Sequence, residues 1–363
     1  PDAVADPPPA VTRADAGPRV DGGLPLVLPG NDPAAIREAA ALLRSGGLVA
    51  FPTETVYGLG ADALDPAAVA RIFAAKERPT FDPLIVHLAD AADVGDHAEA
   101  ADASDPRVTR LAARFWPGPL TLVLRKRDHI PGIVTAGLPT VGLRVPDHPV
   151  ALALIRAAGL PVAAPSANRF GRVSPTRASH VVRGLGSRVR LVLDGGPCRV
   201  GVESTVILLA EGRAALLRPG GVPAEAIEAE IGALESPADG VTGGAALAPG
   251  GSGAHYAPGA RLEIVDPFGR GAAHRLRARP GERLGLLATS SAGAEAARAV
   301  GGPFAAEEVL AADGDPVIVA ARLFDALHDL DAAGLDRIVA QPVRAAGLGR
   351  AVMDRLRRAA FDA

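Results

Sequence analysis

The sequence predicts an α/β protein built as two domains, and three observations lead to this fold class. Short apolar runs with the length of buried strands alternate with longer segments whose apolar residues recur at helical spacing. The chain has 363 residues, which is long for a single domain of average size. Its periodicity stops within residues 234–259, where Gly, Ala, Ser and Pro accumulate as in a flexible linker.

These patterns divide the chain into four parts. Residues 1–29 are rich in Pro, Asp, Ala and Gly without periodicity, and we expect a disordered leader there. Residues 30–233 form the first α/β domain, and residues 234–259 form the flexible linker. Residues 260–363 are predicted to form a small parallel, Rossmann-like α/β domain, because strands and helices alternate there.

The first helix of the first domain has clear boundaries in the sequence. Asn31 or Asp32 supplies an N-cap, Pro33 occupies the first turn, and Gly46 follows the last turn, so a helix is expected at 33–44. Similar signals predict helices at 66–76, 105–115, 149–158 and 224–231. Apolar runs predict strands at 48–51, 84–86, 120–124, 141–145, 162–164, 191–193, 204–208 and 215–218.

The C-terminal domain follows a simpler pattern. Strands are expected at 261–265, 284–288 and 337–340, with helices at 292–300, 316–330 and 350–361.

Composition excludes several classes of protein. The formal net charge of −3 disfavours wholesale coating of nucleic acid, although a local basic patch remains compatible with it. Cys198 is the only cysteine, which excludes an intrachain disulfide and a cysteine-rich metal site. No apolar stretch reaches the roughly 20 residues that a membrane helix needs, and no secretory leader is evident. We therefore expect a cytoplasmic protein without a membrane partner.

Common catalytic motifs are missing or incomplete. Gly58-Leu-Gly60-Ala-Asp-Ala63 is similar to a dinucleotide-binding loop, but a polar stretch separates it from the preceding strand. The chain has no GxxxxGK[ST] phosphate-binding loop, and Ser166 does not lie in a GxSxG nucleophile motif. The eight His residues show no paired metal-ligand spacing, so we expect no metal held by protein ligands.

Lys76 and Arg78 are candidates for binding an anion. A basic pair at a helix C-terminus commonly just complements the helix dipole. Here Pro79 and Pro83 stiffen the segment and His87 follows on a strand, which favours a binding role. Arg offers a planar fork and Lys a compact charge, a combination that suits a triphosphate.

Other polar residues lie where apolar strands end. Ser166-x-Asn168 follows a strand of small residues and is either an ordinary turn or a place where a ligand approaches the backbone. Arg144 lies inside an apolar strand, so it needs either a buried acid or a substrate carboxylate as its partner. Glu203-Ser204-Thr205 and Arg218 occupy similar positions at strand ends.

These segments recur together, in order, in one known family. They are Pro52-Thr-Glu-Thr-Val-Tyr-Gly58, Lys76-x-Arg78, Phe115-Trp-Pro-Gly-Pro-Leu-Thr121, Ala164-Pro-Ser-Ala-Asn168, Ser174-Pro-Thr176, Asp194-Gly-Gly196, Gly201-Val-Glu-Ser-Thr205, Leu217-Arg-Pro-Gly220, His255-Tyr256-Ala257-Pro258, Gly347-x-Gly349 and Asp354-Arg355. The chain resembles the YrdC-type threonylcarbamoyl-AMP synthases in their long, two-domain form. The resemblance implies a YrdC-like twisted mixed sheet with flanking helices in the first domain.

The resemblance also implies an activity. Members of the family are nucleotidyltransferases that condense L-threonine, bicarbonate and ATP into threonylcarbamoyl-adenylate and release pyrophosphate, with Mg²⁺ accompanying ATP. Their product serves a tRNA threonylcarbamoyl transferase complex that modifies the adenosine next to the anticodon, and the resemblance leaves direct tRNA binding open.

Site residues carry over by resemblance, position by position. Lys76 and Arg78 would be catalytic. Threonine would be held by Thr55, His87, Arg144, the backbone of Ala164, and Ser204. ATP would be held by Arg78, Asp82, the backbone of Thr140, Ser166, Asn168, Ser174 and Arg218. His255 and Tyr256 would form a lid from the linker.

Two departures from the family pattern bear on these assignments. Asp82 stands where the family has Asn, so its carboxylate either turns toward Mg²⁺ or weakens contacts with ATP. Gly253 replaces an aromatic residue of the linker motif. Two alternative functions are a carbamoyl-adenylate-forming enzyme that uses carbamoyl phosphate, disfavoured because the chain lacks Cys-rich zinc modules, and a module that binds double-stranded RNA.

Overall fold

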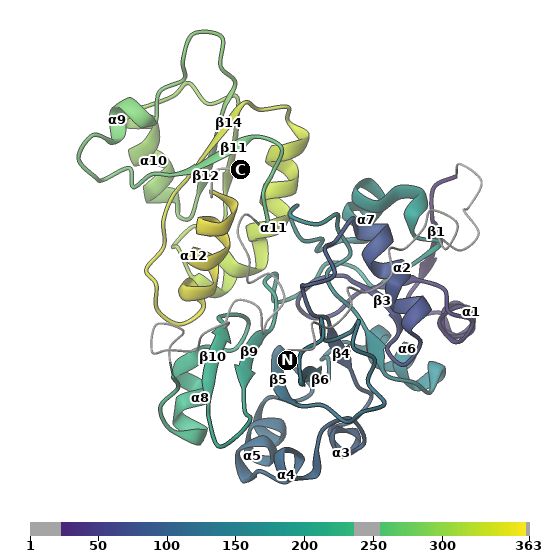
Figure 1. Ribbon diagram of the computed structural model, residues 1–363. Coiled ribbons are helices and arrows are strands. Elements are labelled where there is room, and N and C mark those ends of the chain that lie inside the picture. The colour runs from purple at the N-terminus through teal and green to yellow at the C-terminus, as the bar shows by residue number, and fades with distance from the viewer. Residues whose placement is uncertain (1–22, 236–254, 361–363) are drawn as a thin grey trace, which may run out of the picture.

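A ten-stranded mixed sheet organises the first domain (Figure 1). The computed structural model describes residues 23–235 and 255–360. In spatial order the strands are β1 (Leu26–Pro29), β8 (Leu191–Asp194), β2 (Val49–Phe51), β3 (Gly58–Asp62), β7 (Val162–Ala163), β4 (Ile85–His87), β6 (Thr140–Arg144), β5 (Leu120–Arg125), β9 (Thr205–Leu208) and β10 (Ala215–Arg218). Parallel pairs such as β4–β6 and antiparallel pairs such as β5–β6 both occur, which confirms the mixed sheet.

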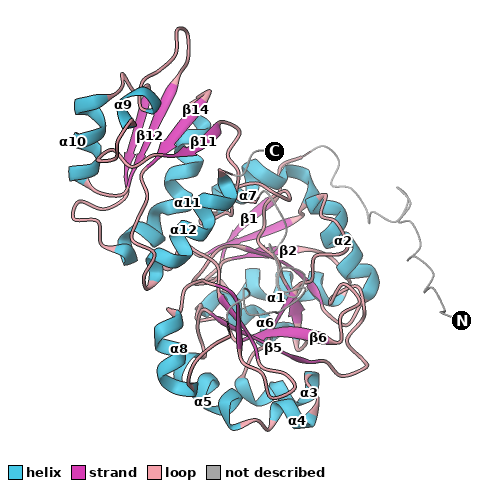
Figure 2. Ribbon diagram, turned by 60° about the vertical axis from the view of Figure 1, so that its left-hand side comes forward, coloured by secondary structure: helices cyan, strands magenta, loops and turns pink. Residues whose placement is uncertain are grey.

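Helices cover both faces of this sheet because its strands are apolar on both sides (Figure 2). On β2, Val49 and Phe51 pack with α1 (Pro33–Arg44) and α6 (Pro149–Ala158). Ala50 points to the other face and joins the core cluster of the remaining helices. These are α2 (Pro66–Lys76), α5 (Pro106–Phe115), α7 (Ala178–Leu185) and α8 (Ala224–Ile231), with the short α3 (Val94–His97) and α4 (Ala100–Ala103) nearby.

The C-terminal domain is a four-stranded parallel sheet between two helical layers, as predicted. Its strands, in spatial order, are β11 (Arg261–Ile264), β14 (Arg337–Ala340), β12 (Leu284–Ala288) and β13 (Ala306–Val309). The helices α9 (Ala272–Arg275) and α10 (Ser291–Val300) pack on one face. The helices α11 (Pro316–Ala332) and α12 (Leu348–Ala359) pack on the other.

The predicted leader extends too far into the fold. Residues 26–29 form the edge strand β1, which pairs in parallel with β8. Leu26 and Val27 keep 49% and 42% of their surface exposed, so the segment lacks the burial pattern by which strands are recognised. Residues 1–22, the linker segment 236–254 with Gly253, and residue 361 of the last predicted helix lie outside the described residues.

The glycine-rich Gly58–Asp62 segment is strand β3 rather than a loop that bends around a ligand. A Cβ atom on Gly60 would lie 2.7 Å from the Phe51 ring and 2.8 Å from Val162 Cγ1. Glycine is therefore needed at position 60 because side chains of the neighbouring strands fill the space that a Cβ atom would occupy. This packing accounts for the similarity to a dinucleotide-binding loop, and no bound dinucleotide is needed to explain it. The strand β13 and the helix α7 were likewise not predicted.

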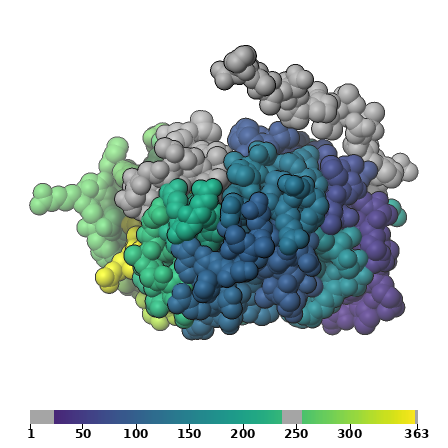
Figure 3. Space-filling view, turned by 60° about the horizontal axis from the view of Figure 1, so that its bottom comes forward, coloured from purple at the N-terminus to yellow at the C-terminus, as the bar shows by residue number. Residues whose placement is uncertain are grey.

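The two domains share one hydrophobic cluster. Val56 and Val202 of the first domain join Tyr256 of the connecting segment (residues 255–259) and Phe324 of α11. A Cβ atom on Gly201, whose φ is +73°, would lie 2.4 Å from a backbone oxygen of α11. Figure 3 shows the yellow C-terminal residues next to the green residues that end the first domain. The C-terminal domain is thus docked against the first domain by close packing.

None of the described helices is long and apolar enough to cross a membrane.

A stacked histidine pair crosses the domain boundary and predicts sensitivity to acid. The rings of His180 on α7 and His328 on α11 lie 3.9 Å apart, His328 Nε2 contacts the Ser174 carbonyl, and Asp325 lies 3.5 Å from His180. Burial and the neighbouring His328 lower the pKa of His180 to about 3, and burial also lowers the pKa of His328. The unfolded chain therefore binds more protons than the folded one below about pH 6.5.

Stability is expected to fall as the pH drops below that value, by about 2 kcal/mol at pH 5 from His180 alone. Thermal melting of the full chain at pH 7.5 and pH 5, compared with His180→Gln, measures this effect. The variant should lose less stability on acidification, and equal losses would contradict the assignment. Asp325 pairs with Arg177, which lowers its pKa, so this carboxylate titrates below the tested range.

Candidate functional site

A polar cavity lies where several strands of the first domain end, with the connecting segment at its edge. It encloses about 540 Å³ of non-atom space, part of it open to solvent. Parallel pairing places His87 at the end of β4 beside Arg144 at the end of β6, and an antiparallel bridge joins Gly58 to Ser166. The residues that line the cavity are Thr53, Thr55, Val56, Gly58, Arg78, Ile85, His87, Arg144, Ala164, Pro165, Ser166, Glu203, Ser204, Arg218, His255 and Tyr256.

Arg144 is held by a buried acid. Its Nη2 donates to Glu54 Oε1 at 2.6 Å and to Thr55 Oγ1 at 3.0 Å, and its Nε donates to the Gly118 carbonyl at 3.3 Å. Of the two partners that the sequence allowed, the structure contains the buried acid. Because Arg144 also lines the cavity, its guanidinium is fixed in direction and available to a carboxylate there.

His87 adds a neutral polar group beside Arg144. Burial lowers its pKa to about 3, and the charge of Arg144 acts in the same direction. Its buried Nδ1 has no hydrogen-bond partner among the described residues. A neutral imidazole with an unpaired nitrogen at a cavity wall suits a polar substrate group.

Arg218 and Ser204 form a second cationic part of the wall. Arg218 Nε and Nη2 donate to the Ser204 carbonyl at 3.2 and 3.0 Å, and Nη2 also donates to Ser204 Oγ at 3.2 Å. Ser204 Oγ in turn lies 2.8 Å from Thr121 Oγ1. The side chain of Arg218 is thus oriented by the turn that precedes β9.

Asp82 forms an ion pair with Arg78 across one helical turn. Arg78 Nη2 lies 2.9 Å from Asp82 Oδ2, and each side chain is only 3% exposed. Asp82 does not line the cavity, whereas Arg78 does. The carboxylate therefore lies behind the arginine that faces the cavity and offsets part of its charge.

Lys76 and Asn168 also lie behind the wall. Lys76 Nζ donates to the carbonyls of Ser166 and Asn168, both at 2.5 Å, and the lysine is 1% exposed. Asn168 Nδ2 donates to the carbonyls of Arg169 and Arg172. Burial, followed by the charge of Arg78, lowers the pKa of Lys76 well below its ordinary value. These contacts fix the turn whose Ser166 lines the cavity.

Glu203 links another predicted residue to the cavity. Glu203 lines the cavity, and Ser174 does not. Ser174 Oγ donates a hydrogen bond to Glu203 Oε1 at 2.6 Å. His255 and Tyr256 close the same side, with their rings 4.2 Å apart and both residues buried. Burial and the nearby Arg78 and Lys76 lower the pKa of His255, which is therefore neutral.

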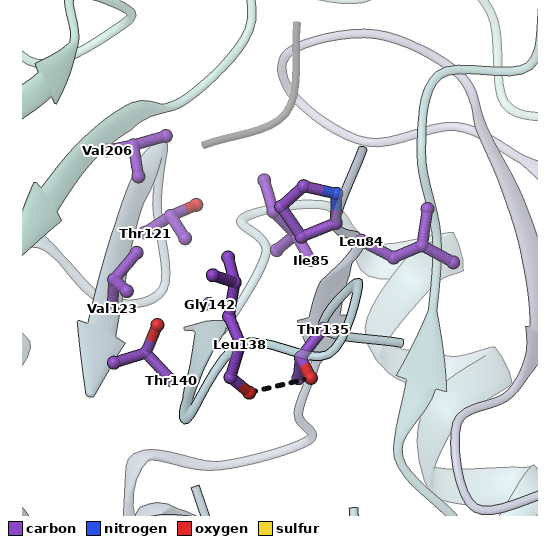
Figure 4. A pocket seen from close by; sticks show the side chains of 10 residues that line it. Leu84, Ile85, Thr121, Val123, Thr135, Leu138, Thr140, Gly142 and Val206 are labelled. Atoms are coloured by element: carbon purple, nitrogen blue, oxygen red, sulfur yellow. Dashed lines mark hydrogen bonds between the residues drawn. The ribbon is translucent and has the colours of Figure 1, made fainter. Parts of the chain in front are cut away.

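Thr140 lines a neighbouring cavity of about 290 Å³ of non-atom space, whose lining contains no charged residue (Figure 4). Figure 4 shows Thr140 of β6 below Val123, on the same side as Thr121 and Val206, with Ile85 and Thr135 across from them. Ile85 lines both cavities, so the two adjoin. The predicted Thr140 is thus near the polar cavity but outside it.

The lining of the polar cavity favours an anionic ligand. Three arginines, Arg78, Arg144 and Arg218, line it together with one carboxylate, Glu203. Guanidinium groups bind carboxylates and phosphates through charge-assisted hydrogen bonds. Among the described residues no group of three or more His, Cys, Asp or Glu is placed to hold a metal ion.

Three members of this network, Glu54, Glu203 and Arg355, lie within segments that the sequence singled out but were given no role in the site. Nothing in the sequence indicates that these charged residues are buried. An acid within the hydroxyl-rich segment that precedes β3 was the one available signal for Glu54.

The fold and the cavity define a two-domain α/β protein in which a YrdC-like sheet carries a cationic cavity and a parallel α/β domain docks beside it. A Sua5/YciO/YrdC family model described as "Telomere recombination" matches residues 41–220. A second model, described as "Threonylcarbamoyl-AMP synthase, C-terminal domain", matches residues 222–361. The chain belongs to the threonylcarbamoyl-AMP synthase family, as its resemblance in sequence predicted.

Similar relatives span both domains. The chain is 45% identical to the threonylcarbamoyl-AMP synthase of Pyrococcus abyssi, with 89% of this chain and 93% of the relative covered. It is 44% identical to that of Bacillus subtilis, with 91% and 94% covered. A crystal structure of P. abyssi Sua5 complexed with L-threonine superposes with a TM-score of 0.81 at 40% identity, covering 93% of this chain and 97% of that one.

Proposed function

We infer that this chain is a nucleotidyltransferase that makes L-threonylcarbamoyl-adenylate from L-threonine, bicarbonate and ATP and releases pyrophosphate. One observation carries this conclusion. A single cavity brings together an oriented guanidinium with neutral polar groups, which suit an amino acid, and two further arginines, which suit phosphates. The named relatives and the threonine-bound neighbour structure support the same activity.

The reaction needs no protein nucleophile. The neutral threonine amine attacks the carbon of bicarbonate, and one oxygen leaves with two protons as water while the carbamate forms. If CO₂ is attacked instead, no water leaves and the amine releases one proton. A carbamate oxygen then attacks the α-phosphorus of ATP, and the bond to the β-phosphate oxygen breaks to release pyrophosphate. Negative charge accumulates on phosphoryl oxygens, so fixed cations and precise positioning supply the catalysis.

The amino-acid half is built on Arg144. Its guanidinium, held by Glu54, would bind the threonine carboxylate. Thr55, Ser204 and the neutral His87 would bind the hydroxyl and the amine, while the backbone of Ala164 lies at the same wall. A neutral His87 accepts a hydrogen bond without repelling the substrate amine.

In the nucleotide half of the site, ATP would be bound by Arg78 and Arg218, together with Ser166, which lines the same cavity. Thr140, which lines the adjoining cavity, would contact ATP through its backbone. Lys76, Asn168 and Ser174 would act as positioning residues, since each contacts a part of the wall from behind. Mg²⁺ would enter as part of the Mg–ATP substrate, and Asp82 pairs with Arg78.

We also propose that the product passes to a tRNA threonylcarbamoyl transferase complex in the cytoplasm, because an acyl adenylate is a short-lived activated donor that requires an acceptor nearby. In this account the chain itself supplies the first step of the modification next to the anticodon.

An omission assay tests the activity. The full chain is incubated with Mg–ATP, bicarbonate and threonine, and pyrophosphate is measured as each substrate is left out in turn. We expect release only with all three. Equal release without threonine would overturn the assignment, and release that requires carbamoyl phosphate would identify the carbamoyl-adenylate alternative.

A further inference from the structure

Arg355 lies on α12 of the C-terminal domain, yet it reaches the wall of the polar cavity. It is 1% exposed. Its Nε donates to Glu203 Oε2 at 2.8 Å and its Nη1 to the Pro219 carbonyl at 2.9 Å. Its guanidinium carbon lies 5.2 Å from the centre of the Tyr256 ring. One side chain therefore contacts three separate segments around the cavity.

Each of these segments carries a part of the nucleotide half. Glu203 lines the cavity and accepts the hydrogen bond of Ser174. Pro219 directly follows Arg218 at the end of β10. Tyr256 lines the cavity and stacks on Phe324 of α11, with ring centres 5.5 Å apart. Arg355 thus links the docked domain to residues that face the phosphates.

Arg355 also neutralises the charge of the Glu203 carboxylate in the cavity wall. A carboxylate that faces a triphosphate would repel it unless a cation lies behind it. Burial acts to raise the pKa of Glu203, but Arg355 and Arg218 more than offset this, so the carboxylate is ionised and neutralised by its neighbours. The Nη2 atom of Arg355 is buried and has no hydrogen-bond partner among the described residues, so Glu203 and Asp354 are its main compensation.

We propose that Arg355 is a positioning residue for ATP: by fixing and neutralising Glu203, and by bracing Tyr256 and the turn after Arg218, it makes the nucleotide half of the site depend on the docked C-terminal domain. The proposal rests on the proposed function only in naming ATP as the ligand.

A matched pair of variants tests it in the full chain. Arg355→Met removes the charge and keeps the length of the side chain. Arg350→Met removes another arginine of α12 that also bridges the domains, since Arg350 pairs at 3.1 Å with Glu225, a residue outside the cavity lining. ATP and threonine binding are each measured by isothermal titration calorimetry, which needs no turnover.

We expect Arg355→Met to weaken ATP binding about 10–100-fold, as for a lost charged hydrogen bond, while threonine binding stays within about twofold. Arg350→Met should leave both unchanged. Adding Glu203→Gln to Arg355→Met should recover part of the ATP affinity, because the uncompensated carboxylate is then gone.

Wild-type ATP affinity in Arg355→Met, equal losses in the two single variants, or equal losses for ATP and threonine would overturn the proposal. If Arg355→Met does not fold, Arg355→Lys decides: it keeps the charge but cannot serve Glu203 and Pro219 together, so undiminished ATP affinity would refute the role. Failure of the proposed function would appear separately, as absence of threonine-dependent pyrophosphate release by the unmodified chain.

Discussion

Replacing Arg144 with alanine is expected to lower kcat/KM for threonine by about 10²–10³-fold, mainly through KM, because a charge-assisted pair of hydrogen bonds to the carboxylate is lost. The effect should be large since the guanidinium is held rigidly by Glu54 and is therefore positioned before the substrate binds. Initial rates of pyrophosphate release at varied threonine concentration measure it, and KM for ATP should change little.

Two controls separate binding from folding. Arg144→Ala leaves Glu54 as an unpaired buried carboxylate, so Glu54→Gln is added to remove that cost. Arg199→Ala removes an arginine whose ion pair with Asp147 is largely exposed, and it should be indistinguishable from the unmodified chain. An unchanged KM for threonine in the folded double variant would show that Arg144 does not hold the substrate.

Replacing Arg78 with glutamine is expected to reduce kcat by about 10²–10³-fold, the range typical when a fixed group that stabilises transition-state charge is removed. Arg78 faces the cavity from the end of α2, and its planar fork suits phosphoryl oxygens. Single-turnover rates with saturating threonine and Mg–ATP measure the chemical step. The double variant with Asp82→Asn also removes the carboxylate that pairs with the Arg78 guanidinium, and so separates the loss of the cation from the effect of that carboxylate.

Asp82→Asn alone should improve ATP binding, in contrast to the loss of activity expected for Arg78→Gln. Removing the carboxylate 2.9 Å from Arg78 leaves the guanidinium more cationic toward the cavity, and KM for ATP is expected to fall a few-fold. A rise in KM for ATP in a folded Asp82→Asn chain would mean that the carboxylate contributes to nucleotide binding directly.

Most of the architecture was accessible from sequence because it depends on local signals. Asp32 accepts the hydrogen bond expected of a cap at the start of α1, and buried strands follow the apolar runs. The elements that were missed depend on distant partners. The edge strand β1 is defined only by its pairing with β8. The strand β3 has a glycine-rich sequence that does not look like a strand, because the side chains of Phe51 and Val162 leave no room for a side chain at Gly60.

In the candidate site, too, some residues were located from the sequence and others were not. Motif residues such as Arg144 and Ser204 were located by resemblance, and the fold brings both to one cavity. The acids that orient the arginines were not located, because an ion pair such as Glu203 with Arg355 joins positions 152 residues apart. Lys76 shows the limit of type-based reasoning, since its ammonium group serves two backbone carbonyls behind the wall.

The proposed reaction joins threonine, a carbonyl from bicarbonate and the adenylate of ATP in one cavity. Mass spectrometry of the products formed from ¹³C-bicarbonate, threonine and Mg–ATP measures whether all three are combined. We expect an adenylate that contains threonine and carries the ¹³C label, in equal amount to the pyrophosphate released. An unlabelled adenylate, or pyrophosphate formed without any threonine-containing adenylate, would contradict it.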